Sequence, residues 1–150
     1  SKPDQLGWAT PIYVAETDEI ARKEAEEHIE NFFNKFLYSP MEYKMPPGYS
    51  SVASYKKVME QKMRVRMKYM SFDNLIDEGM FLCGSPATVV ETLQKREHDL
   101  GFQNLVAMLQ FGTLPAELSD KNLRMFAGEV MPKLQASSPQ VARETAPAAE

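Results

Sequence analysis

Apolar residues in this chain occur either in short unbroken runs or at helical spacing. Short β-prone or fully apolar runs occupy 11–15, 80–83 and 105–109. Runs of this length, bounded by glycine or polar residues, are typical of strands in a parallel sheet that is covered on both faces. The pattern therefore predicts three strands, and the segments between them are long enough to hold helices.

After each predicted strand, apolar residues recur every three or four positions, which indicates an amphipathic helix. These helices are expected over about 17–37, 85–101 and 119–134. Residues that favour helix starts precede each of them. The expected N-caps are Thr17 with Asp18, Ser85 before Pro86, and Ser119 with Asp120.

Residues 38–78 interrupt this order and are interpreted as a helical insertion. Proline, glycine and serine predict turns over 38–52. The apolar spacing favours a helix over 55–62, whereas the pattern over 63–70 permits a helix or a strand. A short helix is expected over 71–78, ended by a glycine.

Strands that alternate with helices predict the α/β class with parallel strands and three βα units. Three units make an open α/β layer or part of a (β/α)₈ barrel, which needs about 250 residues. With 150 residues the chain is too short for a whole barrel, so the expected sheet has open edges and favours a homo-oligomer. The expected domain covers 1–134, and 135–150 has the composition of a disordered tail.

Charge is unevenly distributed along the chain, whose formal net charge is −4. The 41–70 segment has seven basic and two acidic residues and holds six of the ten methionines. It is interpreted either as a surface that meets a partner or as a solvated face. The acidic balance and the lack of a nucleic-acid motif argue against nucleic acid.

No apolar run reaches the roughly 18 residues that span a bilayer, and no signal peptide opens the sequence. We therefore expect a soluble, cytoplasmic protein without a membrane contact. The single cysteine, Cys83, excludes an internal disulfide and lies in an apolar run, so it is expected to be a small buried hydrophobe.

Several short motifs occur in order over about 11–134. They are Ala15 to Ala21 at a strand-to-helix junction, Pro46 to Tyr49, Gly84-Ser85-Pro86, Leu100-Gly101-Phe102, Phe111-Gly112 and Val130-Met131-Pro132. In this order they resemble the C-terminal part of the luciferase-like flavin-dependent monooxygenases.

The resemblance implies an enzyme built on a (β/α)₈ barrel, of which this chain would supply the C-terminal three βα units. It also implies chemistry in which reduced flavin, FMN or a deazaflavin, activates O₂ for attack on a small organic substrate. A flavin reductase would be a partner. Most groups that hold the flavin in this family come from strands that precede this part, so we expect these 150 residues to be inactive alone.

Candidate site residues lie where the predicted strands end, because barrel active sites lie at the carboxyl ends of the strands. Ser85 either presents its hydroxyl and amide groups to an anion of the cofactor or is an ordinary N-cap. Gln110 either binds the polar edge of a flavin or a substrate carbonyl, or is simply a polar strand end. Phe111 either forms a pocket wall or belongs to the core.

The insertion is a candidate lid. Tyr49, Tyr55 and Lys56 are of the kinds that exclude water from a reactive oxygen adduct, and they are equally suited to an ordinary surface. The alternative function is a non-catalytic α/β module that docks a partner through the basic 41–70 segment.

Other chemistry has little support. His28 follows Glu24 by one helical turn, a spacing that suits a metal, but no third ligand is apparent and a solvated helix face is favoured. We therefore expect no metal site. The sequence has neither a glycine-rich phosphate loop nor a credible Ser-His-Asp set.

Overall fold

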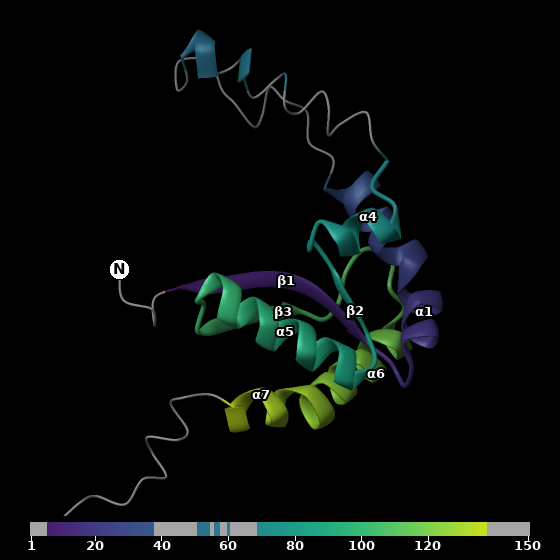
Figure 1. Ribbon diagram of the computed structural model, residues 1–150. Coiled ribbons are helices and arrows are strands. Elements are labelled where there is room, and N and C mark those ends of the chain that lie inside the picture. The colour runs from purple at the N-terminus through teal and green to yellow at the C-terminus, as the bar shows by residue number, and fades with distance from the viewer. Residues whose placement is uncertain (1–5, 38–50, 55, 58–59, 61–68, 138–150) are drawn as a thin grey trace, which may run out of the picture.

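A computed structural model describes residues 6–37, 51–54, 56, 57, 60 and 69–137 (Figure 1). In this part of the chain three strands form one parallel sheet in the order β2-β1-β3. The strands are β1 (Gly7–Val14), β2 (Leu82–Gly84) and β3 (Asn104–Met108). The predicted α/β class with parallel strands is confirmed, and β1 begins four residues before the predicted start.

The strand order corrects one expectation. Three consecutive strands of a barrel would lie in the order 1-2-3, whereas here β1 is central and β2 and β3 do not touch as strands. β3 pairs with residues 7–11 of β1, and β2 pairs only with residues 12–14 on the other side. The short β2 is therefore not the middle one of three barrel strands, because β1 lies between β2 and β3.

Helices fill the connections, and two of them continue through a π-helical turn. They are α1 (Asp18–Asn31) with η2 (Phe32–Phe36), α4 (Phe72–Asp77), α5 (Pro86–Leu100), and α6 (Ala116–Met125) with η3 (Phe126–Val130) and α7 (Met131–Ser137). Side chains of Thr17, Ser71 and Ser85 cap α1, α4 and α5 by accepting a backbone N–H. Gly101 ends α5 in the left-handed conformation.

The start of the last helix differs from the expected one. α6 begins at Ala116 behind Pro115, and the side chain of Ser119 lies inside the helix, where its Oγ donates to the Pro115 carbonyl at 3.0 Å. A hydroxyl used in this way cannot cap, so the predicted Ser119–Asp120 cap is wrong. The helix also continues to Ser137, into the predicted tail, of which 138–150 lie outside the described residues.

Two apolar clusters cover the two faces of β1. On one face Ile12 and Val14 pack against α5 and the α6–η3–α7 helix. The members of this cluster from the helices include Val89, Leu93, Phe126 and Val130. On the other face Tyr13 and Ala15, at the carboxyl end of β1, pack against α1 and α4. Figure 1 shows α1 and α4 gathered at this end of the strand.

The second face is bare beside the first half of β1. Ala9 and its register partner Val106 lie on this face, and both are exposed, Val106 by 62%. α1 and α4 do not extend over them. One face of the β1–β3 pair is thus covered along its length and the other only at the carboxyl end.

Asn122 joins β1 and β3 where their ladder stops. Its Oδ1 accepts the Val14 N–H at 2.8 Å, and its Nδ2 donates to the carbonyls of Ile12 at 2.8 Å and Leu109 at 2.9 Å. The side chain is completely buried. Three backbone groups that the diverging strands leave unpaired are therefore satisfied by one amide.

Replacing Asn122 with alanine should lower the free energy of unfolding by about 3 kcal/mol, because it leaves buried backbone donors and acceptors without a hydrogen-bond partner. Denaturant titration measures the change. Asn31→Ala is the matched control; it removes a 3.4 Å bond to Thr113 at the surface and should cost less than about 1 kcal/mol. Equal effects of the two substitutions would contradict the proposed role of Asn122.

Gly112 allows the loop after β3 to touch α1. Its φ is +55°, and a Cβ there would collide with the His28 carbonyl oxygen, which belongs to the helix backbone and cannot move aside easily. Both the conformation and the close approach therefore require glycine.

Gly112→Ala should destabilise the fold by about 2 kcal/mol. Gly128→Ala is the control with the opposite expected sign. Gly128 is helical and has open space around its Cβ position, so the substitution should raise the free energy of unfolding by about 0.5 kcal/mol. Thermal and denaturant unfolding of both variants check the signs. A neutral Gly112→Ala variant would show that the loop does not need this contact.

Candidate functional site

The loops that follow the strands meet at the carboxyl end of the sheet, where the site was expected. Ser85 lies there at the start of α5, but the groups that would bind an anion already have a partner. The Ser85 backbone N–H donates to Asp18 Oδ1 at 2.6 Å, and Thr88 Oγ1 donates to Asp18 Oδ2 at 3.0 Å. The Ser85 hydroxyl caps the helix by accepting the Thr88 N–H. An outside anion reaches this helix end only by displacing Asp18.

The electrostatics agree with this geometry. The backbone hydrogen bond from Ser85, with smaller help from the side chains of Thr88 and Ser85, lowers the pKa of Asp18 despite some burial. The carboxylate thus supplies within the chain the negative charge that a helix N-terminus favours.

Gln110 and Phe111 follow β3 and have different surroundings. Gln110 is exposed and lies at the strand end, where it is open to a ligand. The Phe111 ring is 3% exposed and packs edge-on against Tyr13 and Phe81, with centroid distances of 6.4 and 5.4 Å. Phe111 therefore belongs to the core, which was one of its two interpretations.

The candidate lid is only partly described. Tyr49 and Tyr55 lie outside the described residues, and Lys56 is exposed. The last part of the expected insertion is different, because Phe72 and Leu75 of α4 are buried in the core. Residues 69–78 are thus a fixed part of the fold. The lid and the basic docking surface over 41–70 stay predictions.

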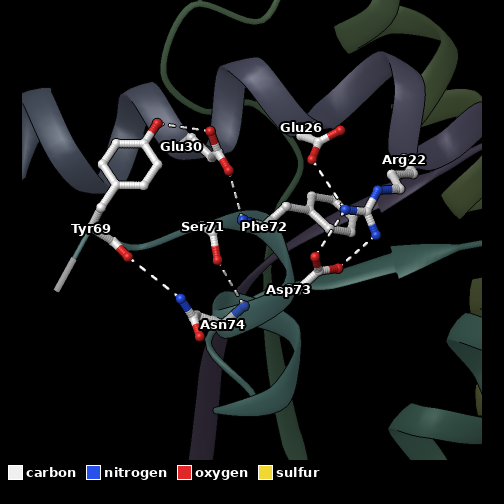
Figure 2. Close-up of polar contacts among 8 residues, drawn as sticks. All are labelled: Arg22, Glu26, Glu30, Tyr69, Ser71, Phe72, Asp73 and Asn74. Carbon is white, nitrogen blue, oxygen red and sulfur yellow. Dashed lines mark hydrogen bonds and ion pairs between the residues drawn. The ribbon is translucent and has the colours of Figure 1, made fainter.

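A polar clamp, formed by Arg22, Glu26, Glu30, Tyr69, Phe72 and Asp73, fastens α4 to α1 (Figure 2). Arg22 binds both oxygens of Asp73, at 2.6 and 3.1 Å, and Glu26 at 3.1 Å. Its guanidinium also lies over the Phe72 ring, 4.6 Å from the centroid. These hydrogen bonds from Arg22 lower the pKa of Asp73.

The second half of the polar clamp holds the chain just before α4. Glu30 accepts the Phe72 N–H at 2.7 Å and the Tyr69 hydroxyl at 2.8 Å. One turn further along the helix, Asn34 donates to the Met70 carbonyl at 3.0 Å and accepts its N–H at 3.1 Å. Tyr69 and Met70 are therefore held against the C-terminal end of the α1–η2 helix.

A second polar cluster joins α6 to α1. Lys121 Nζ contacts Glu16 at 2.8 Å and both Glu24 oxygens at 2.9 Å, while the buried Tyr13 hydroxyl donates to Glu24 at 2.9 Å. Burial, followed by the bond to Glu24, raises the pKa of Tyr13, which stays protonated. Burial alone would lower the pKa of Lys121, but its two carboxylate partners outweigh it and raise that pKa. Charges in this cluster are satisfied internally.

His28 has a role that the sequence did not indicate. Its Nδ1 lies 2.8 Å from Thr113 Oγ1, so the ring binds the loop after β3 and is more than part of a solvated helix face. The two residues are 85 positions apart, and no local pattern announces such a contact. Among the described residues no group of three or more His, Cys, Asp or Glu side chains is placed to hold a metal ion.

A shallow cavity of about 330 Å³ opens between α1, α4 and the start of α5. Asp18, Arg22 and Asp73 line it, and each is paired as described. Cys83 also lines it, and burial raises the pKa of this thiol. A protonated thiol is a poor nucleophile, so the cavity offers no evident reactive group.

Comparison of the chain with protein-family models, curated proteins and solved structures finds no match. In the described part of the chain, no helix combines the length and the apolar character needed to cross a bilayer.

Asp18→Asn should lower the free energy of unfolding at neutral pH by about 1 kcal/mol, since it weakens charge-assisted hydrogen bonds at a partly exposed position. A carboxylate whose pKa is lowered by folding stabilises above its unfolded pKa, about 3.9, and this contribution is lost as the pH falls through the folded value. The gap between the wild type and the variant should therefore close below about pH 4.

Glu19→Gln is the control for this prediction, because Glu19 follows Asp18 in the first turn of α1 and is exposed. It should change stability by less than about 0.5 kcal/mol. Denaturant unfolding from pH 3 to 7 checks both variants, and a gap for Asp18→Asn that widens in acid would contradict the assigned role of the carboxylate.

Proposed function

We propose that this chain is part of a luciferase-like flavin-dependent monooxygenase and supplies two neighbouring βα units of its (β/α)₈ barrel. The units are β1 with α5 and β3 with α6. The stretch between β1 and α5, which contains α1, α4 and β2, would be an excursion at the mouth of the barrel. This proposal replaces the three consecutive units expected from the sequence with two.

One observation carries the proposal: α5 and the α6–η3–α7 helix pack on the same face of the β1–β3 pair. In a barrel every helix lies outside, so neighbouring units place their helices on one face. The opposite face would then line the interior, where strands from the rest of the barrel cover it. Ala9 and Val106 are exposed on that face, and Val106 belongs to the apolar run 105–108 of β3, which agrees with this arrangement.

The described residues fit only part of a flavin site. The end of α5 at Ser85 does not suit the flavin phosphate, because the Asp18 carboxylate occupies it. The phosphate would therefore be bound by other parts of the barrel, as the resemblance implies. Gln110 is the described residue best placed to meet the polar edge of a flavin or a substrate carbonyl, since it is exposed at the carboxyl end of β3.

The remaining roles follow from position. The polar clamp between α1 and α4 would make the excursion a rigid wall beside the barrel mouth. Tyr49, Tyr55 and Lys56 lie in the sequence between α1 and α4 and are the proposed substrate-side residues. When bound, reduced FMN or a deazaflavin would supply the electrons that activate O₂, and a flavin reductase would supply the reduced cofactor.

The test compares the 150-residue chain with a longer polypeptide that adds the other barrel strands. The longer protein should bind FMN or a deazaflavin, seen by fluorescence quenching, and should consume O₂ when reduced flavin is supplied. The 150-residue chain should show neither. Flavin binding by the 150-residue chain as a monomer, or no binding by the longer protein, would overturn the proposal.

Within the longer protein, Gln110→Ala should lower turnover by about tenfold while the melting temperature stays unchanged. Gln103→Ala is the matched control, because Gln103 precedes the opposite end of β3 and should leave turnover as it is. Equal turnover in the two variants would exclude Gln110 from the site without testing the barrel itself.

A further inference from the structure

The chain is anchored on both sides of Gln110. Before it, the Leu109 carbonyl accepts a hydrogen bond from Asn122 at 2.9 Å. After it, the Phe111 and Leu114 side chains are buried in one apolar cluster, and the Leu114 N–H donates to the Phe111 carbonyl at 3.1 Å, which closes a turn. Gln110 itself is exposed. Its side chain therefore projects from a main chain that its neighbours hold in place.

Two further residues of this turn contact α1. Gly112 lies so close to the helix that a side chain there would collide with the His28 carbonyl oxygen. Next to it, the Thr113 hydroxyl lies 2.8 Å from Nδ1 of the half-buried His28 ring. Asn31, three residues further along α1, donates to the same hydroxyl at 3.4 Å. Because a hydroxyl has one proton and two lone pairs, Thr113 can accept from Asn31 and donate to a neutral imidazole at the same time.

We propose that His28 is a positioning residue of the candidate site: by holding Thr113 it keeps the turn after β3 against α1, and the turn keeps Gln110 in place. This role rests on the proposed function, because Gln110 is assigned there to the flavin or a substrate carbonyl. It also gives α1 a part in the site, although α1 belongs to the excursion and not to either barrel unit.

The contact is suited to positioning more than to stability. The Thr113 side chain is exposed and the His28 ring is half-buried, so water can take the place of either partner when the other is removed. Losing the hydrogen bond should therefore change the unfolding equilibrium little, whereas the turn loses a fixed point on α1. A contact that served only the fold would leave Gln110 where it is.

The first test measures the turn by NMR in the 150-residue chain. Thr113→Val replaces the hydroxyl with a methyl group, and Thr113→Ser keeps the hydroxyl. With valine, the Gln110 amide signals should shift and hydrogen exchange of the Leu114 N–H should become at least about threefold faster, because the turn opens more often. With serine, both should stay close to those of the wild type.

Variants of the histidine complete this test. His28→Ala should reproduce the effect of Thr113→Val, whereas His28→Asn, whose amide lies near the position of Nδ1, should restore the turn. His98→Ala is the matched control, because His98 is exposed on α5 and its Nδ1 lies 3.3 Å from the adjacent Asp99. Unchanged Gln110 signals and Leu114 exchange in both His28→Ala and Thr113→Val, or equal changes with valine and serine, would overturn the role of His28.

The second test uses the longer protein. Thr113→Val should lower kcat by about threefold and leave KM unchanged, since a displaced Gln110 affects the reacting geometry, and Thr113→Ser should have the wild-type kcat. A wild-type kcat for Thr113→Val, where Gln110→Ala impairs turnover, would overturn the role of His28 alone. A longer protein that binds no flavin would overturn the proposed function, and the site role of His28 would fall with it.

Discussion

The arrangement of this fold depends on a single buried amide. β1 and β3 pair over five residues and then separate, and parallel strands that part inside a core leave backbone groups that neither water nor a ladder satisfies. Asn122 fills the gap by bonding to both strands. Since Asn122 belongs to α6, the same contact fixes this helix against the sheet. Asn122 thus holds the ends of β1 and β3 together at the position where the two chains separate. Beyond this position the chain after β1 continues into α1.

Local signals in the sequence were reliable where short-range chemistry decides the structure. Thr17 and Ser85 cap helices as expected, because caps depend on a few neighbouring residues. The Ser119 cap failed for the same kind of reason, since an earlier start at Ala116 was available behind a proline. Strand order was beyond such signals: whether β2 or β3 lies beside β1 depends on contacts between residues about 70 to 100 positions apart.

The candidate site shows the same division. Ser85 was identified as a helix start that could hold an anion, and the structure supplies that anion from Asp18, 67 positions away. His28 looked like a surface residue because its partner Thr113 follows a different strand. The sequence allowed Phe111 to be either a pocket wall or a core residue. Its contacts with two aromatic rings show that it is a core residue. In each of these three residues the side-chain type indicated which interactions were possible, but contacts with residues distant in the sequence determined which interaction is made.

The pairing of Asn34 with Met70 has a consequence for how the chain can vary. Its two hydrogen bonds hold together the two positions that flank residues 38–68, so the chain between Asn34 and Met70 is a loop whose ends are fixed against each other. The entropy of closing such a loop grows with the logarithm of its length, by about 0.6 kcal/mol for each doubling. Relatives with a shorter or longer stretch would therefore keep nearly the same stability, and the sequence there can change with whatever it contacts while the sheet and helices stay as they are.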